Sequence, residues 1–276
     1  MNFRTKGQVA KLDIASIAGF IMGVVMFVYG VSSGDEGIAA LGNMYDYSSV
    51  LITIGGSLAG VLASHKLSDF IAGLKSFSMV FKDKKADVGE VIKNIIDLSN
   101  IARKEGLLAL EEAANGIEDE FLKKGVMLVV DGTDPELVRG ILETDLDCIE
   151  ARHKKVIGFW LKWAELGPAW GMIGTLIGLI NMLKTLSDVS TVGPNMSVAL
   201  VTTLYGSLIA NWLCAPAAAK LSVDNDTEIM LKEVTVEGLL SIQAGENPRV
   251  IEEKLKSFLS PKMREGMSKE QAGGEA

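Results

Sequence analysis

Four long stretches without a charged side chain limit what this chain can fold into. Residues 14–34 form an uninterrupted run of 21 uncharged residues, and as a helix such a run reaches roughly 31 Å, enough to cross the hydrocarbon core of a bilayer. Residues 47–64 and 166–183 form two further runs of 18 residues each, and we expect a fourth helix over 195–219. Four such runs in one short chain exceed what the core of a soluble protein contains. The sequence therefore predicts four transmembrane helices.

The positions of the basic residues predict how these helices are oriented. Lys and Arg concentrate on the cytoplasmic side of membrane proteins. Basic residues precede the first run and lead into the third between Arg152 and Lys162, whereas the connection between the first two runs has none. Only Lys184 lies between the third and fourth runs. We expect a multi-pass protein of the bacterial plasma membrane with both termini in the cytoplasm.

The uncharged runs divide the chain into five segments. We expect a cytoplasmic N-terminus at 1–12, two transmembrane helices within 13–64, a helical cytoplasmic loop at 65–160, two more transmembrane helices within 161–219, and a cytoplasmic tail at 220–276.

The long loop has the periodicity of amphipathic helices. Apolar residues recur at steps of three and four from Val88 to Leu98, with charged residues on the opposite face. Thr133, followed three residues later by Glu136, predicts the start of a helix that continues into the third membrane run. The predicted fold class is all-α: a polytopic membrane protein with four transmembrane helices and a helical cytoplasmic domain.

Composition excludes several classes of function. The formal net charge of −8 argues against nucleic acid as a partner, because phosphate binding needs a basic surface. Two cysteines and two histidines occur without metal-ligand or disulfide spacing. The sequence also lacks a Walker-type phosphate loop and a catalytic cluster. We therefore expect no cofactor, no metal and no enzymatic activity.

The lack of charge within the runs is itself informative. Ion-coupled membrane proteins normally place an ionisable side chain inside the bilayer, and these four runs contain no Asp, Glu, Lys, Arg or His. Either the protein does not move ions, or a partner supplies the titratable group. Glycines at helix-packing spacing serve either contacts within the chain or subunit assembly: Gly19 and Gly23, Gly56 and Gly60, and Gly167, Gly171, Gly174 and Gly178.

The third run, LGPAWGMIGTLIGLINML, and the following VALVTTLYGSLIANWLCAPAAAKL resemble the MotA/PomA family of flagellar stator subunits. The resemblance covers nearly the whole chain. It implies that five such subunits surround two copies of a single-span, peptidoglycan-binding partner of the MotB type, whose Asp carries the ion. It also implies conversion of proton or sodium flow into torque for motility and chemotaxis. The alternative, an ExbB/TolQ-type energiser of envelope transport, is disfavoured because those proteins resemble three-span chains.

The resemblance assigns an ion path and a coupling role to residues of the third and fourth runs. The family prolines that link ion passage to movement fall on Pro168 and Pro216, although each could equally be a structural helix proline. The threonine beside the family's ion path falls on Thr203. Thr175 and Thr202 add hydroxyls that suit a hard cation, so proton and sodium both remain open.

The resemblance also assigns the torque-generating contact. In the family, an arginine and a glutamate eight residues apart face charges on the rotor protein FliG, and in ARKEGLLALEE they fall on Arg103 and Glu111. Without the resemblance, these residues would be interpreted as a solvated helix face.

Overall fold

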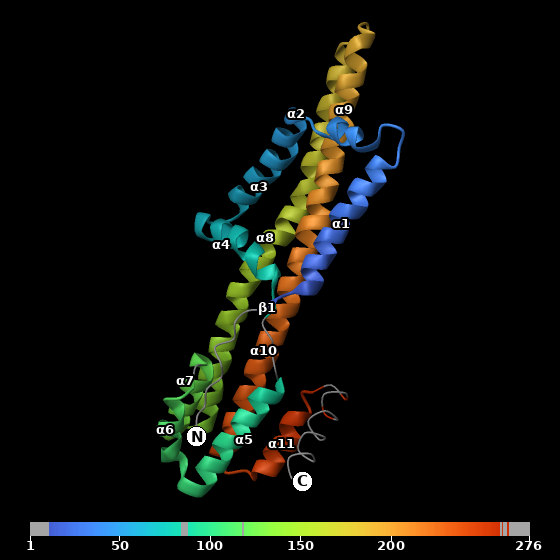
Figure 1. Ribbon diagram of the computed structural model, residues 1–276. Coiled ribbons are helices and arrows are strands. Elements are labelled where there is room, and N and C mark those ends of the chain that lie inside the picture. Colours follow the sequence, from blue (N-terminus) through green and yellow to red (C-terminus); the bar gives the residue numbers. More distant parts are fainter. Residues whose placement is uncertain (1–10, 84–87, 118, 260, 262–263, 265–276) are drawn as a thin grey trace. The chain divides into compact units, whose positions relative to one another are not determined.

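The computed structural model describes residues 11–83, 88–117, 119–259, 261 and 264, and Figure 1 shows that these residues are predominantly helical. Two short strands, β1 (Lys11–Leu12) and β2 (Lys82–Asp83), pair with each other. The chain forms two compact units. We call residues 12–83 and 152–223 the membrane unit, and the described residues of 1–11, 84–151 and 224–276 the polar unit.

Four helices in the described part of the chain are long and apolar enough to cross a membrane. The first is α1 (Ile14–Ser32), and the second comprises α2 (Tyr47–Val50), the π-helix η2 (Leu51–Gly55) and α3 (Gly56–Ser64). The third lies within α8 (Pro135–Lys184), and the fourth comprises α9 (Val189–Ser207), the π-helix η4 (Leu208–Cys214) and the start of α10 (Ala215–Gln243). The predicted four transmembrane helices are thereby confirmed.

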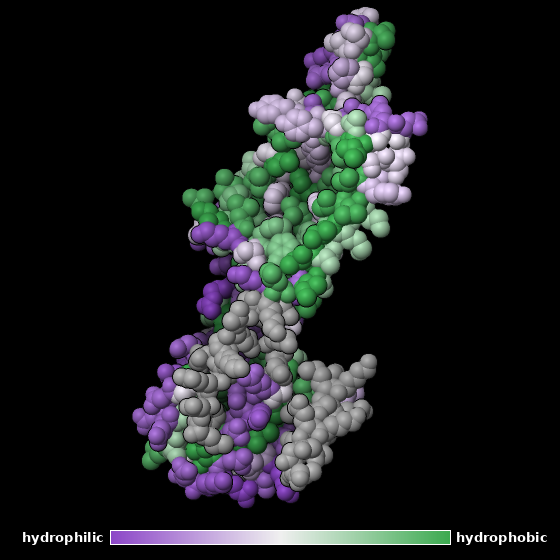
Figure 2. Space-filling model, in the orientation of Figure 1, coloured by the Kyte–Doolittle hydropathy of each residue, from purple (hydrophilic) through white to green (hydrophobic). Residues whose placement is uncertain are grey.

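The surface of the first helix suits contact with lipid. None of the residues of α1 is buried within the chain, and Figure 2 shows hydrophobic side chains along α1 and hydrophilic ones at the connection that follows it. That connection includes the 3-10 helix η1 (Gly37–Met44). An apolar surface exposed along a whole helix is stable where the surrounding solvent is itself apolar.

Two helix starts differ from the sequence-based prediction. The fourth spanning helix begins at Val189 rather than Asn195, because the Asp188 carboxylate accepts a hydrogen bond from the Ser190 amide at 3.1 Å. Helix α8 begins at Pro135, and its first turn is capped by Asp134, which accepts from the Glu136 amide at 2.9 Å, rather than by Thr133. The predicted continuation of α8 into the third span is confirmed over 50 residues.

An aromatic cluster joins α4 (Leu67–Val80) to α8 inside the membrane unit. The indole nitrogen of Trp160 donates to Ser76 Oγ at 2.9 Å, and that of Trp163 donates to Ser57 Oγ at 3.1 Å. Each of these two buried indole N–H groups thus has a partner, and the rings pack edge to face, tilted or stacked. The cluster comprises Phe20, Phe70, Phe77, Phe81, Phe159, Trp160 and Trp163. Helix α4 therefore packs within the membrane unit, although its residues fall in the segment expected at 65–160.

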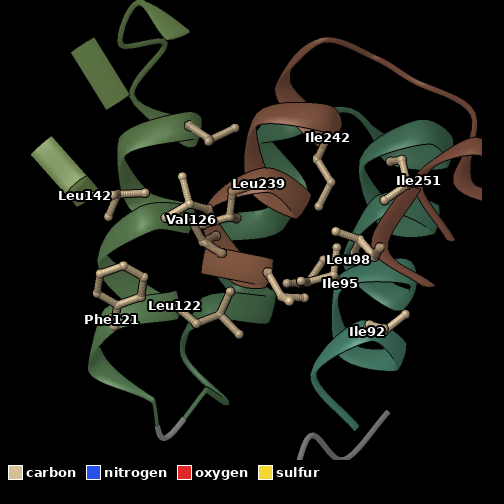
Figure 3. Packing of buried hydrophobic residues seen from close by; sticks show 14 of the residues in the cluster. Ile92, Ile95, Leu98, Phe121, Leu122, Val126, Leu142, Leu239, Ile242 and Ile251 are labelled. Atoms are coloured by element: carbon tan, nitrogen blue, oxygen red, sulfur yellow. The ribbon is translucent and has the colours of Figure 1, made fainter. Parts of the chain in front are cut away.

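The polar unit has its own hydrophobic core. Its helices are α5 (Val88–Glu105), α6 (Leu110–Ala114), α7 (Glu120–Val130), α11 (Pro248–Lys256) and parts of α8 and α10, with the 3-10 turn η3 (Leu107–Ala109) between α5 and α6. Figure 3 shows Ile95, Val126, Leu142 and Leu239 pointing into a common interior. A side chain at Gly125 would collide with Leu239, so α7 and α10 pack closely. The amphipathic periodicity of α5 is confirmed.

Replacing Leu142 by alanine tests this core against a matched position on the same helix. Leu142 is fully buried, whereas 57% of Leu137 is exposed. We expect Leu142→Ala to lower the free energy of unfolding of the polar unit by about 2–5 kcal/mol. Leu137→Ala is expected to change it by less than about 0.5 kcal/mol. Proteolysis across a urea series, with the detergent-purified protein, measures both; equal losses would contradict the assignment of the core.

Candidate functional site

The third and fourth spans approach each other through glycine. A Cβ added at Gly171 would lie 2.9 Å from the Thr202 carbonyl oxygen, and one at Gly178 would lie 2.7 Å from the Asn195 carbonyl oxygen. At the next crossing, a Cβ on Gly206 would lie 2.6 Å from the Gly167 carbonyl oxygen. The glycines of the third span therefore serve packing of α8 against α9 within the chain. The sequence had left open whether they serve contacts within the chain or subunit assembly.

The other predicted glycine pairs behave differently. A side chain at Gly23 would clash with Trp212, and one at Gly56 would clash with Trp170, so each glycine accommodates an indole of another span. Gly19 has no neighbouring atom within 4 Å of an added Cβ.

The close approach of α8 and α9 brings two predicted site residues together. The hydroxyl oxygens of Thr175 and Thr203 lie 2.6 Å apart. Both hydroxyls also lie within hydrogen-bond distance of the Ala199 carbonyl oxygen, at 2.9 Å from Thr175 and 3.2 Å from Thr203. Thr203 is exposed and Thr175 half-buried. We call these two side chains the hydroxyl pair.

Thr202 is fully buried, unlike the hydroxyl pair. Its hydroxyl lies 2.9 Å from the Val198 carbonyl oxygen and 3.1 Å from the Ala199 carbonyl oxygen, the atom that the hydroxyl pair also approaches. Its backbone carbonyl faces Thr53 of η2, whose hydroxyl lies 3.4 Å away. The structure thus brings Thr203 together with Thr175 of the neighbouring helix rather than with Thr202, its neighbour in sequence. A role for Thr202 in the ion path stays a prediction.

An exposed strip of apolar side chains flanks the hydroxyl pair. Residues at steps of three and four share one face of a helix. On α8 this face carries Pro168, Met172, Leu176 and Leu179, and on α9 it carries Met196, Leu200 and Thr203; all seven are exposed. We call these residues the strip. It is an apolar helix face with one polar position, formed where the two spans meet.

Pro216 lies just after a stretch of wide helical turns. The π-helix η4 ends at Cys214, and the Ala215 amide donates to the Ala210 carbonyl, five residues back. In an ordinary α-helix, a proline ring collides with the carbonyl four residues before it. A widened turn relieves this collision, and such turns occur frequently at functional sites. Pro216 is exposed, as is Pro168.

Pro216 also borders a cavity of about 280 Å³ in the membrane unit. The cavity is lined by Ser16, Gly19, Phe20, Val80, Trp212, Pro216 and Lys220. Beside it, Lys220 Nζ lies 2.8 Å from Asp13 Oδ2. Asp13 also caps α1, accepting from the Ala15 amide at 3.0 Å and from the Ser16 hydroxyl at 2.7 Å. The hydrogen bond from Lys220, helped by that from Ser16, holds the pKa of the Asp13 carboxyl well below its ordinary value.

Arg103 and Glu111 lie in the polar unit on either side of one turn. Arg103 belongs to the last turn of α5 and Glu111 to the first turn of α6. Gly106 reverses the chain between them with φ of +86°, a conformation that L side chains rarely adopt. Both charged side chains are exposed. The sequence resemblance singled out Arg103 and Glu111, whereas no sequence pattern predicted the Asp13–Lys220 pair or the aromatic cluster.

Replacing Asp13 by asparagine tests the ion pair with the cap retained, because asparagine caps helices as well as aspartate does. A carboxylate with a lowered folded-state pKa stabilises the fold above its unfolded pKa, and this contribution is lost as the pH falls below about 4. We expect Asp13→Asn to have a lower melting temperature at neutral pH and a smaller further loss on acidification. The exposed Asp35→Asn serves as control. If the melting temperatures of wild type and Asp13→Asn fall by the same amount between neutral pH and about pH 3, the prediction is contradicted.

Comparison with known proteins places the chain in a family. Residues 113–234 match the MotA/TolQ/ExbB proton channel family. Motility protein A of Treponema pallidum is 39% identical over 94% of this chain and 98% of its own length. Chemotaxis protein PomA of Vibrio alginolyticus is 37% identical over 90% and 96%. Bacillus subtilis YtxD, which carries no functional name, is 41% identical over 91% and 92%.

Solved structures agree with these relatives. The structure of Campylobacter jejuni MotAB matches with a TM-score of 0.82 and 30% identity, covering 91% of this chain and 97% of that one. The flagellar MotAB stator complex of B. subtilis matches with a TM-score of 0.83 and 31% identity, covering 91% and 98%. These relatives are named as a motility protein and a chemotaxis protein, and the solved structures are MotAB complexes, so the ExbB/TolQ alternative is not supported. The chain belongs to the MotA/TolQ/ExbB proton channel family and, within it, to the motility proteins of the MotA and PomA type.

Proposed function

We propose that this chain is the A subunit of a flagellar stator, which with a MotB-type partner forms an ion channel and turns ion flow into torque for motility and chemotaxis. The observation that carries this proposal is the hydroxyl pair on the strip. It offers oxygen atoms at a membrane helix face whose spans contain no ionisable residue. Relatives named for motility and structures of MotAB complexes support the same function.

The strip suits a partner helix that carries a carboxylate. Exposed Met, Leu and Pro side chains allow close packing against another apolar helix, while a hydroxyl provides a hydrogen bond to a polar group that crosses the bilayer there. A single-span partner of the MotB type with one membrane Asp meets both requirements. Five copies of this chain around two of the partner would surround the partner helices with five strips, and the partner's outer domain would hold peptidoglycan.

The ion is a proton or sodium. The oxygens of Thr175, Thr203 and the Ala199 carbonyl form a small cluster of the ligand type that hard cations prefer. Alternatively, the same hydroxyls can form hydrogen bonds with a partner carboxylate both when it is ionised and when it is protonated. Pro168 lies in the strip and Pro216 follows the wide turns of η4, so both are placed to link a change at the ion site to movement of a helix.

The polar unit is proposed to act on the rotor from the cytoplasm. Both termini and the long loop lie inside, in a chain that spans the plasma membrane. Arg103 and Glu111 are exposed on either side of one turn and would face opposite charges on FliG. The work is mechanical, so the chain needs no catalytic group or cofactor of its own.

Alanine at Thr203 tests the ion site. Loss of a hydrogen bond to a charged group costs about 1.5–3 kcal/mol, which corresponds to a fall in ion-limited rate of roughly 10- to 100-fold. We expect Thr203→Ala to reduce swimming speed severely and Thr203→Ser to retain it. Thr191→Ala is the matched control, because the Thr191 hydroxyl, in the first turn of α9, donates to the hydroxyl of Thr185 in the connection between α8 and α9 at 2.7 Å.

The measurement uses cells in which this gene supplies the only stator A subunit. Swimming speed is recorded across sodium concentrations, with and without a protonophore. A response to sodium alone identifies sodium as the ion, and collapse with the protonophore alone identifies the proton. Normal swimming of the Thr203→Ala cells, or of cells without the gene, would reject the proposal.

Reversal of the charge at Arg103 tests the rotor contact. Arg103→Glu places like charges opposite each other, so we expect slow or absent rotation. A compensating acid-to-base change on the rotor protein is expected to restore it. The same reversal at Lys124, which pairs with Asp145 at 2.5 Å elsewhere in the polar unit, is the control and is not expected to respond to the rotor change. Failure of every compensating rotor change to rescue Arg103→Glu would reject direct pairing.

A further inference from the structure

The turn between Arg103 and Glu111 also presents an apolar side chain to the outside. Three leucines follow Gly106, and they divide by burial: Leu110 is fully buried, Leu107 packs against the core, and Leu108 is 74% exposed. Among the described residues of the polar unit, the other large exposed hydrophobic side chains are Leu137 at 57% and Val250 at 56%. Leu108 is therefore the most exposed large apolar side chain described in this unit.

The local backbone holds Leu108 outward. The Gly106 amide closes α5 by donating to the Ala102 carbonyl at 2.9 Å, and the Ala109 amide donates to the Gly106 carbonyl at 3.2 Å. Leu107 and Leu110 stand three residues apart and both contact the core, so the intervening Leu108 points away from it. The exposure of Leu108 follows from an anchored turn and not from a free chain end.

Charged side chains flank Leu108 in the sequence on both sides of the turn. Arg103, Lys104 and Glu105 precede it and Glu111 and Glu112 follow it, and all five are exposed. An exposed apolar residue flanked by charged ones is typical of the centre of protein interfaces, where the anchor is desolvated and its surroundings exclude water. Exposed ion pairs alone are weak and screened by salt, whereas burial of an apolar side chain is not screened.

We propose that Leu108 is the apolar anchor of the rotor contact. It enters an apolar depression on the rotor protein whose rim carries acidic groups opposite Arg103 and Lys104 and basic groups opposite Glu111 and Glu112. This inference rests on the proposed function and adds to it a contact that is independent of charge. The charges orient the two surfaces, and Leu108 resists their separation while force is transmitted.

Site-specific crosslinking in cells identifies what covers Leu108. A benzophenone amino acid is placed at position 108 or, as control, at position 137, and the products are identified by mass spectrometry. We expect position 108 to crosslink to the rotor protein and position 137 not to. Crosslinks from position 108 only to another copy of this chain, or to neither protein, would overturn the proposal.

Binding and torque provide the second readout. We expect Leu108→Ala to raise the Kd of the purified stator complex for the rotor protein by roughly tenfold, equally at low and high salt, and to lower the stall torque of tethered cells. Arg103→Ala is expected to lose its effect on Kd at high salt. Leu108→Met is expected to behave as wild type, as is Leu137→Ala, with membrane levels matched by immunoblot. A Kd and a torque unchanged by Leu108→Ala would overturn the proposal.

Different results would reject the proposed stator function and the proposed role of Leu108. If cells without this gene swim normally, the proposed function fails, and the role of Leu108 fails with it. If swimming requires the gene but Leu108→Ala retains full torque, only the apolar anchor is wrong.

Discussion

The approach of backbone to backbone between α8 and α9 is the contact on which the candidate site depends. Gly167 and Gly206 meet without side chains between them, and Gly171 meets the Thr202 carbonyl in the same way. A Cβ at any of these glycines would separate the helices. Only at this short separation can Thr175 of one span reach Thr203 of the other at 2.6 Å. The hydroxyl pair is thus a product of glycine packing.

This geometry explains how the spans can serve an ion path without charged residues of their own. A lone ionised group in a bilayer is costly, so a protein that handles ions there needs either a paired charge or neutral oxygens. In this chain the oxygens come from threonine and from a helix carbonyl, and charges such as Asp13 and Lys220 are paired where a span begins or ends. In the proposed function the titratable group belongs to the partner, whose single Asp would meet the apolar face at the hydroxyl pair.

Much of the fold could be predicted because lengths and periodicities are local properties. The uncharged runs predicted all four spans, and the unbroken pattern after Pro135 predicted the long α8. Contacts between helices could not be predicted, because they depend on how each helix is rotated. Thr202 and Thr203 are neighbours in sequence but point about 100° apart around the helix, so one is buried and the other exposed. The Asp13–Lys220 pair joins residues too distant in sequence for any local pattern to connect.

The wide turns of η4 change which residues of the fourth span share one face. Ordinary α-helical steps from Thr203 would bring its exposed face to Cys214 and Ala218, yet both are buried. The exposed positions instead advance through Asn211 to Pro216. The extra backbone in the π-turns therefore sets the rotational phase of everything that follows it. The span is therefore two α-helical segments joined by a widened stretch, and removing one residue between Leu208 and Cys214 would return that stretch to ordinary α-helical turns while keeping Pro216 on its exposed face.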